Sequence, residues 1–312
     1  MGRDLSVEVE NARVLVAIPT YNRARDLARC LEHIAQQTRR PDGMLILDDG
    51  STDSTLSLLR QPPFWVPDDY TIVSRRDKGK RAGAVAFNNL LTRALRKPYD
   101  LIWLMDDDVL PSPNALEKLL DAARRLEGRF SFLASAVYTP GGIPTNPPVI
   151  RASLKPDKRS DLYHCVANRL LPIQAATYVS ILVNAKVARL VGPPLRDFIW
   201  WTDDRMWTFM LQQHLPAYLV ADSRVTHLLA GGVFSVLKCQ HPKRLRRFYF
   251  AIRNSVSILK LGVTLEGPLD ILRAVYFLLA VCDPRKPIKR RATRIGVILA
   301  GLISGLFFRP RK

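Results

Sequence analysis

The chain has 312 residues, of which 47% are hydrophobic, enough to bury a large core. This composition excludes a disordered or collagen-like chain. The formal net charge of +19 predicts attraction to polyanions, which include nucleic acid, an anionic bilayer and phosphate-bearing substrates. Residues 1–13 are polar and charged, so we expect no signal peptide there.

Short apolar runs alternate with helix-like segments over about 125 residues. We expect strands at 14–19, 44–47, 70–74 and 101–105. We expect helices at about 24–37, from a cap at Asp53 or Ser54 to Leu59, at 82–96 and at 113–126. This alternation predicts an α/β fold, with a mainly parallel sheet covered by helices on both faces. Ligands of such sheets collect at the carboxyl ends of the strands.

The second half of the chain has a weaker pattern. Residues 139–172 are rich in Pro, Gly and basic residues and predict a long loop or insertion. An aromatic and acidic cluster at 198–215 leads into a helix. We also expect a strand and a helix within 173–191, a strand before His227, and helices at about 242–260 and 268–281.

The C-terminal segment 285–312 combines positive charge with an apolar run. It holds nine Lys or Arg residues and no acid. The uncharged run 295–308 is shorter than the roughly 20 residues that a membrane-spanning helix needs. We therefore expect this segment to lie on or dip into a bilayer without crossing it.

Three adjacent carboxylates, Asp106, Asp107 and Asp108, follow the expected strand 101–105. Such carboxylates repel one another and cost stability unless a cation offsets their charge. Hard oxygen ligands suit Mg²⁺ or Mn²⁺, which commonly bridge to phosphate oxygens. The alternative interpretation is a solvated acidic turn.

Other strand ends also carry polar residues. Asp49 lies in the Asp-Asp-Gly sequence after the second strand, where a carboxylate can accept hydrogen bonds from a base or ribose. An ordinary Asp-Gly turn is the alternative. Arg81, with Lys78 and Lys80, precedes a small-residue helix start that can cradle a phosphate. A solvated basic loop is the alternative.

The sequence FIWWTDDRMW at 198–207 places two acids among tryptophans. Desolvation there would raise the pKa of Asp203 or Asp204, and a carboxylate tuned in this way can act as a general base. The flat rings of Trp200 and Trp201 can stack on sugar faces. The alternative is a capped helix with core aromatics.

Two further candidates lie near the C-terminal side. His227 follows the last expected strand, and a lone histidine is more often structural than a ligand. The basic amphipathic helix at 242–260 carries Tyr249, Arg253 and Asn254. Arg253 can pair with a phosphate in a bidentate manner, although a helix face with core aromatics fits equally well.

Four motifs in this order resemble those of glycosyltransferase family 2, which has the GT-A fold. They are AIPTYNR (17–23), LDDGSTDST (47–55), WLMDDDVLPSPNALEKL (103–119) and FIWWTDDRMW (198–207). The resemblance covers about residues 13–260. Within the family, the layout is most similar to bacterial galactofuranosyl- and rhamnosyltransferases, which carry a similar aromatic-x-x-Arg-Asn helix.

The resemblance implies a role for each matching position. It implies a nucleotide pocket lined by Thr20 and Tyr21, a base contact from Asp49 and a donor contact from Asp107, beside the phosphate contact expected of Arg81. It also implies a metal site formed by Asp106 and Asp108, joined by His227 as in some galactofuranosyl relatives. Asp204 matches the acid that deprotonates the acceptor hydroxyl.

On the acceptor side, we expect contacts from Trp200, Trp201, Asp203, Tyr249, Arg253 and Asn254. Two positions depart from the family pattern. Met206 stands where relatives often have an acid, so the acceptor can differ here. Phe250 replaces the second tyrosine of an aromatic pair, so one hydroxyl is missing.

Taken together, the resemblance implies an inverting, metal-dependent glycosyltransferase that uses Mg²⁺ or Mn²⁺. The expected donor is a UDP- or dTDP-linked galactofuranose or rhamnose. The expected acceptor is a glycan or a polyprenyl-diphosphate-linked glycan of the cell envelope. We expect a GT-A catalytic domain at 1–235 and a helical, basic, membrane-associating region at 236–312, held peripherally at the cytoplasmic face of the cell membrane.

Two other functions are consistent with parts of the sequence. A sugar nucleotidyltransferase also needs clustered acids, Mg²⁺ and a nucleotide, but the late FIWWTDDRMW motif disfavours it. A basic nucleic-acid-binding protein would explain the +19 charge. Against it, the positive residues gather beside an apolar run and no nucleic-acid-binding motif is evident, so we expect no nucleic-acid partner.

Overall fold

The computed structural model describes most of the chain, and the described residues form two compact units. The described residues are 4–74, 83–150, 167–199, 202–228, 236–237, 239, 242–260, 267–285 and 288–310. One unit, here called the sheet unit, comprises residues 1–81, 86–194 and 207–230. The other, the helical unit, comprises 82–85, 195–206 and 231–312. The expected domain boundary at residue 235 stays a prediction.

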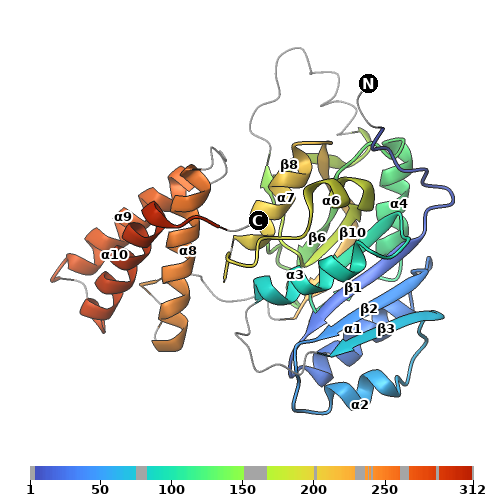
Figure 1. The fold of residues 1–312 in the computed structure, drawn as a ribbon, viewed down its shortest axis with the longest axis horizontal. Coiled ribbons are helices and arrows are strands. Elements are labelled where there is room, and N and C mark those ends of the chain that lie inside the picture. Colours follow the sequence, from blue (N-terminus) through green and yellow to red (C-terminus); the bar gives the residue numbers. More distant parts are fainter. Residues whose placement is uncertain are drawn as a thin grey trace. The chain divides into compact units, whose positions relative to one another are not determined.

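Strands and helices alternate along the sheet unit (Figure 1). The strands are β1 (Val14–Thr20), β2 (Gly43–Asp48), β3 (Asp69–Ser74), β4 (Leu101–Met105), β5 (Val109–Pro111), β6 (Phe132–Tyr138), β7 (Val149–Ile150), β8 (Leu170–Ala175), β9 (Ser180–Asn184) and β10 (Ala217–His227). The helices that lie wholly or mostly in this unit are α1 (Ala24–Ala35), α2 (Thr55–Arg60), α3 (Gly83–Ala94), α4 (Ala115–Arg125), α6 (Ala185–Val191) and α7 (Asp203–Gln212). The helical unit contains α8 (Pro242–Lys260), α9 (Gly267–Cys282) and α10 (Arg291–Phe307).

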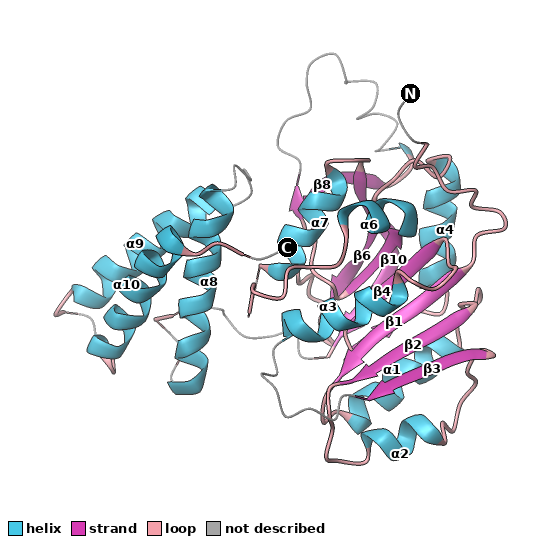
Figure 2. Ribbon diagram, in the orientation of Figure 1, coloured by secondary structure: helices cyan, strands magenta, loops and turns pink. Residues whose placement is uncertain are grey.

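Within the described part of the chain, all ten strands belong to one sheet, shown in magenta in Figure 2. Their order is β3-β2-β1-β4-β9-β6-β10-β8-β7, with β5 paired to β10. The first four strands pair in parallel, as do β6 and β10. Because β9 is antiparallel to both β4 and β6, these six strands point the same way, and their carboxyl ends share one edge of the sheet.

The prediction of a mainly parallel sheet is correct for the first four strands and wrong for the second half. Strand β9 lies between β4 and β6 and is antiparallel to both. Strands β5 and β8 are antiparallel to β10. Strands β8 and β9 therefore both run opposite to β6 and β10. The apolar pattern of a short buried strand does not reveal its direction, which depends on the strands it pairs with.

Side chains that alternate along the buried strands build a core on each face of the sheet. In β1, Val14, Val16 and Ile18 join the core formed with α1, α2 and α4. Leu15 and Ala17 join the opposite core, formed with α3, α6 and α7. Both sets are fully buried, which explains why β1 is a continuous apolar run. The sheet is thus covered on both faces, as predicted.

The long loop expected at 139–172 is partly ordered into strands. Within its described part, β7 pairs with β8, and Tyr138 forms an isolated bridge to Pro144. The chain reverses at Gly142, which has a positive φ of 76°. Residues 151–166 lie outside the described part of the chain.

The helical unit is built around the close approach of α10 to α8. Its small core contains Val236, Leu245, Phe248, Ala274 and Ile298. A Cβ atom added at Gly305 would lie 2.5 Å from the Cβ of Val256 and 2.8 Å from the carbonyl oxygen of Arg253 on α8. Glycine is therefore needed at this position for the two helices to pack. None of the described helices is long and apolar enough to span a bilayer.

We predict opposite effects from two alanine substitutions in α10. Gly305→Ala should destabilise the helical unit by about 1–3 kcal/mol, because the added methyl group meets α8 backbone and a β-branched side chain. Gly296→Ala should stabilise it by about 0.5–1 kcal/mol, because an added Cβ meets nothing within 4 Å there and alanine favours the helix. Urea unfolding followed by circular dichroism measures both. Equal effects would contradict the proposed packing.

Candidate functional site

Three carboxylates stand at the shared carboxyl edge of the parallel strands. β4 ends at Met105, and the turn to β5 carries Asp106, Asp107 and Asp108. β1 lies beside β4 and ends at Thr20. Asp107 and Asp108 are only 8% and 4% exposed. Such burial of two adjacent acids requires compensation by neighbouring donors or cations.

The short strand β5 brings His227 to these carboxylates. β5 pairs antiparallel with the end of β10, which sets His227 opposite Val109. The Leu228 amide then donates to the Asp108 carbonyl at 2.9 Å. The register of β10 against β6 shifts between Val220 and Arg224. Such an irregularity bends the strand and changes the direction of the residues that follow it, which include His227.

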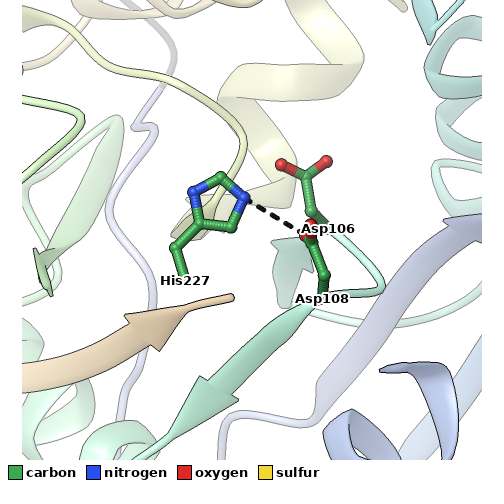
Figure 3. Close-up of side chains that lie close together, drawn as sticks. All are labelled: Asp106, Asp108 and His227. Atoms are coloured by element: carbon green, nitrogen blue, oxygen red, sulfur yellow. Dashed lines mark ion pairs between the residues drawn. The ribbon is translucent and has the colours of Figure 1, made fainter. Parts of the chain in front are cut away.

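Asp106, Asp108 and His227 form a cluster that can hold a metal ion (Figure 3). One ligand atom from each lies within 4.8 Å of the others. His227 Nε2 is 3.2 Å from an Asp108 carboxylate oxygen. Two hard carboxylate oxygens and one imidazole nitrogen form a donor set that fits Mg²⁺ or Mn²⁺. We call these three residues the metal cluster.

His227 is held from its other side by Asn146. His227 Nδ1 is 3.1 Å from the Asn146 side-chain oxygen. An amide oxygen only accepts, so Nδ1–H donates this hydrogen bond and Nε2 faces Asp108. Asn146 lies in the loop after β6 with a left-handed φ of 47°. Asparagine tolerates this conformation better than most residues.

Arg23 and Thr20 supply further compensation for the buried acids. Arg23 Nη1 lies 2.9 Å from an Asp108 carboxylate oxygen, and Arg23 Nε lies 3.7 Å from an Asp107 carboxylate oxygen. Thr20 donates its hydroxyl to Asp107 at 2.7 Å. Sequence reasoning assigned no role to Arg23, although it ends the AIPTYNR motif. Its partners, about 85 positions later, are not readable from that motif.

The pKa values of the two buried acids, Asp107 and Asp108, are shifted in opposite directions. Burial raises the pKa of Asp107 to about 6, although the Thr20 hydrogen bond and the Arg23 charge oppose the rise. Burial also acts to raise the pKa of Asp108, but hydrogen bonds and charges from His227 and Arg23 outweigh it and lower that pKa. In return, Asp108 raises the pKa of His227 against the effect of burial.

The loop after β2 borders this edge of the sheet. Asp48 accepts hydrogen bonds from the Ser51 amide at 3.0 Å and from the Ser74 hydroxyl at 2.9 Å. Its neighbour Asp49 is 6% exposed, and the Asp49 amide donates to the Thr20 carbonyl. Tyr21, which follows β1, is 38% exposed. Thr20 and Asp49 therefore meet at the ends of two adjacent parallel strands.

The helical unit holds the late acidic motif. Asp203 and Asp204 open α7. Burial raises the pKa of Asp204, and the charge of Arg205 and hydrogen bonds from the Asp204 and Arg205 backbone oppose that rise. The Arg205 amide donates to an Asp204 carboxylate oxygen at 2.7 Å. The raised pKa expected from the tryptophan-rich sequence is thus present at Asp204.

Arg253 is engaged within the helical unit. It is 7% exposed and donates to the Asp197 carbonyl at 2.6 Å and to the side-chain oxygen of the fully buried Asn254. Its guanidinium lies 3.7 Å from the centre of the Phe308 ring, and burial lowers its pKa. Tyr249 donates its hydroxyl to Ser304 on α10 at 2.8 Å. These contacts fit the core-packing alternative, and acceptor binding by Tyr249, Arg253 and Asn254 stays a prediction.

The predicted site residues thus fall into three groups. The first group consists of residues that come together at the ends of the strands: Thr20, Asp106, Asp107, Asp108 and His227, with Asp49 and Tyr21 beside Thr20. Asp203, Asp204, Tyr249, Arg253 and Asn254 belong to the helical unit. Arg81, Trp200 and Trp201 lie outside the described residues. Two further contacts were not predicted from the sequence: Arg23 pairs with Asp107 and Asp108, and Asn146 bonds to His227.

Sequence comparison relates the chain to known glycosyltransferases. A sequence model of glycosyl transferase family 2 matches residues 15–169. Galactofuranosyltransferase GlfT1 of Mycobacterium tuberculosis is 27% identical over 251 residues, which cover 77% of this chain and 80% of that protein. Polyprenol monophosphomannose synthase of Mycolicibacterium smegmatis is 29% identical over 150 residues, 47% of this chain and 53% of that one.

Solved structures share the fold. A mannosyltransferase from Pyrobaculum calidifontis, solved in complex with GDP-Man and Mn²⁺, matches with a TM-score of 0.52 at 17% identity. The match covers 95% of this chain and 87% of that one. Two larger solved chains match with TM-scores of 0.54 and 0.56, and this chain spans 43% and 54% of their lengths. The fold is therefore GT-A-like, with a mixed sheet flanked by helices. The chain is a glycosyltransferase and belongs to glycosyl transferase family 2.

Proposed function

We propose that this chain is an inverting, metal-dependent transferase of galactofuranose or rhamnose, which uses a UDP- or dTDP-linked donor. The metal cluster carries this proposal, because it places two carboxylates and an imidazole together at the strand ends where α/β sheets bind ligands. The similarity to GlfT1, which is named a galactofuranosyltransferase, supports the sugar.

The donor is held at the carboxyl edge of β1, β2 and β4 in this proposal. Thr20, Tyr21 and Asp49 line the nucleotide pocket, and Asp49 accepts hydrogen bonds from the base. Asp107 faces the donor sugar. The Thr20 hydroxyl donates a hydrogen bond to one of the Asp107 carboxylate oxygens and holds it in place. The Arg23 guanidinium can donate two parallel hydrogen bonds to the diphosphate, and Arg81 supplies a second positive charge beside it.

Asp106, Asp108 and His227 hold Mg²⁺ or Mn²⁺. The ion, when bound, neutralises charge that develops on the leaving diphosphate. The tautomer of His227 suits this role, because Asn146 accepts from Nδ1–H and leaves Nε2 for the metal. Arg23 keeps Asp108 ionised, since its charge contributes to the lowered pKa of that carboxyl.

Asp204 is the base in the transfer step. The acceptor hydroxyl oxygen attacks the anomeric carbon from the face opposite the diphosphate, and Asp204 takes the hydroxyl proton. The carbon–oxygen bond to the diphosphate breaks as the new glycosidic bond forms, so the configuration inverts. The raised pKa of Asp204 makes it a better proton acceptor than an exposed aspartate. Trp200, Trp201, Asp203, Tyr249, Arg253 and Asn254 stay proposed acceptor contacts.

The acceptor in this proposal is a glycan of the cell envelope, free or linked to a polyprenyl diphosphate. The similarity to a protein named for polyprenol phosphate chemistry supports a lipid carrier. The nine cations of 285–312 support an anionic membrane partner at the cytoplasmic face, with the region 236–312 bound peripherally. Family membership favours this reaction over nucleotidyl transfer and over nucleic-acid binding.

We predict that Mn²⁺ binding depends on the metal cluster. At about 100 times its dissociation constant, Mn²⁺ should stabilise the chain by about 2.7 kcal/mol, seen as a raised melting temperature. Asp106→Asn and Asp108→Asn should abolish this shift. Asp121→Asn, which removes an acid paired with Lys118 and Arg124 on α4, is the matched control and should keep it. A full shift in the Asp108 variant would contradict the metal site.

We predict that Asp204→Asn separates donor binding from transfer. Calorimetry with Mn²⁺ should show that wild type binds UDP-galactofuranose or dTDP-rhamnose, and that the variant binds it with unchanged affinity. Transfer should fall by about 10²–10⁴-fold, the usual contribution of a general base. Retained turnover would remove Asp204 from this role. A wild-type chain that binds neither donor would overturn the proposed sugar.

The pH profile provides a second test of Asp204. The base must be deprotonated, so transfer should be lost as pH falls through its raised pKa. Arg205 lowers that pKa. Arg205→Gln should therefore move the acidic limb of the profile to higher pH, whereas Arg205→Lys should leave it in place. An acidic limb that does not move in Arg205→Gln would mean that it reports another group.

A further inference from the structure

The helical unit turns apolar side chains outward on two neighbouring helices. On α9, the exposed stripe is Leu272, Val275, Tyr276 and Leu279, at the spacing of one helix face. On α10, which packs against α9, it is Leu299, Ile303, Leu306 and Phe307. We call these eight residues the apolar face. Figure 1 shows α9 and α10 in orange and red.

The exposed side of α10 lacks the polarity of an ordinary surface helix. Residues 292–307 are all described and contain one charged residue, Arg294, which is buried. Thr293 is the one polar residue at an exposed position of this stretch. Surface helices of water-soluble proteins carry polar and charged side chains outward. Exposed apolar patches of this kind mark a surface that meets another apolar phase or partner.

Cations stand at both ends of α10. Arg285, Lys289 and Arg290 are exposed in the connection that precedes the helix, and Arg309 is exposed after it. No Asp or Glu occurs in residues 284–312. This charge suits anionic headgroups, whereas a second copy of the chain would bring like charges together. A helix that lies in the plane of the interface has this arrangement, with apolar side chains below cationic ends.

We propose that the apolar face and its flanking cations are the surface through which the chain binds an anionic lipid bilayer, with α9 and α10 lying in the plane of the interface. This membrane surface rests on the proposed function in one respect only: a lipid-linked acceptor would explain why the chain binds a bilayer. The proposal narrows the membrane association expected of region 236–312 to one face of α9 and α10, and it names the side chains that enter the lipid.

Flotation of the full chain with vesicles tests this surface. Wild type should bind phosphatidylcholine vesicles that contain phosphatidylglycerol, and bind less to phosphatidylcholine alone. Ile303→Glu with Leu306→Glu should reduce partitioning by at least about 10-fold, because charges are placed in the apolar phase. Leu190→Glu, at a leucine that is 48% exposed on α6 in the sheet unit, should have no effect.

Removal of charge tests the electrostatic part. Lys289→Gln and Arg290→Gln should each lower partitioning into the anionic vesicles by about fivefold. Unchanged partitioning of the double Glu variant would overturn the proposal. So would a wild-type dimer that the Glu variant converts to a monomer, because a second copy would then cover the face. Donor binding, measured without vesicles, is independent, so its failure would affect only the proposed function.

A second observation concerns Asn146 and the metal cluster. The geometry points to Asn146 as a positioning residue that fixes the ring orientation and tautomer of His227. It combines the 3.1 Å contact to Nδ1 with a left-handed backbone conformation in the loop after β6. Partners of metal-bound histidines that accept from the second ring nitrogen typically change metal affinity when removed.

Direct measurement of Mn²⁺ affinity, from the electron paramagnetic resonance of the free ion, tests this role. Asn146→Gly removes the side chain but tolerates the positive φ, so strain is not added. It should weaken Mn²⁺ binding by about 10–100-fold. Asn146→Asp keeps an acceptor oxygen and should retain near-wild-type affinity. Unchanged affinity in Asn146→Gly, or no rescue by Asp, would overturn the assignment. A wild-type chain that binds no Mn²⁺ would overturn the metal dependence itself.

Discussion

The arrangement of the sheet unit depends on the compensation of negative charge at the end of β4. Asp107 and Asp108 are almost fully buried, and ionised carboxylates in such surroundings cost several kcal/mol unless they are paired. Their partners come from three separate segments: Thr20 from β1, Arg23 from the start of α1 and His227 from the end of β10. The same contacts that stabilise the acids therefore assemble the metal cluster.

Local pattern in the sequence predicted the first half of the fold well. Every expected element up to residue 126 is present, with ends that differ by no more than two residues. Fully buried parallel strands are continuous apolar runs that end abruptly in polar residues. For the same reason, the amino-acid sequence alone was enough to place the acids of 106–108 at a strand end.

The sequence did not predict the direction of the later strands, nor the contacts between residues that are far apart in the chain. The apolar run of β9 fits a buried strand in either direction, and its antiparallel course depends on β4 and β6. β5 is only three residues long, yet it sets His227 beside Asp108 through a pairing that spans more than a hundred positions. The roles of Arg23 and Asn146 could not be inferred from the sequence. An arginine in a loop and an asparagine among prolines indicate no function until the residues they contact are known.

The competition of Arg23 with any metal for one carboxylate has a thermodynamic consequence. Asp108 bonds to the guanidinium at 2.9 Å, and the same side chain belongs to the metal cluster. Whatever draws the arginine toward a phosphate group frees charge on Asp108 for an ion. By reciprocity, an ion that neutralises Asp108 frees Arg23 to bind phosphate. The ion then favours phosphate binding by the same free energy as phosphate favours ion binding. If the proposed donor draws Arg23 away in this manner, the cation and the nucleotide strengthen each other's affinity, and the affinity of each measured alone is lower than its affinity in the presence of the other.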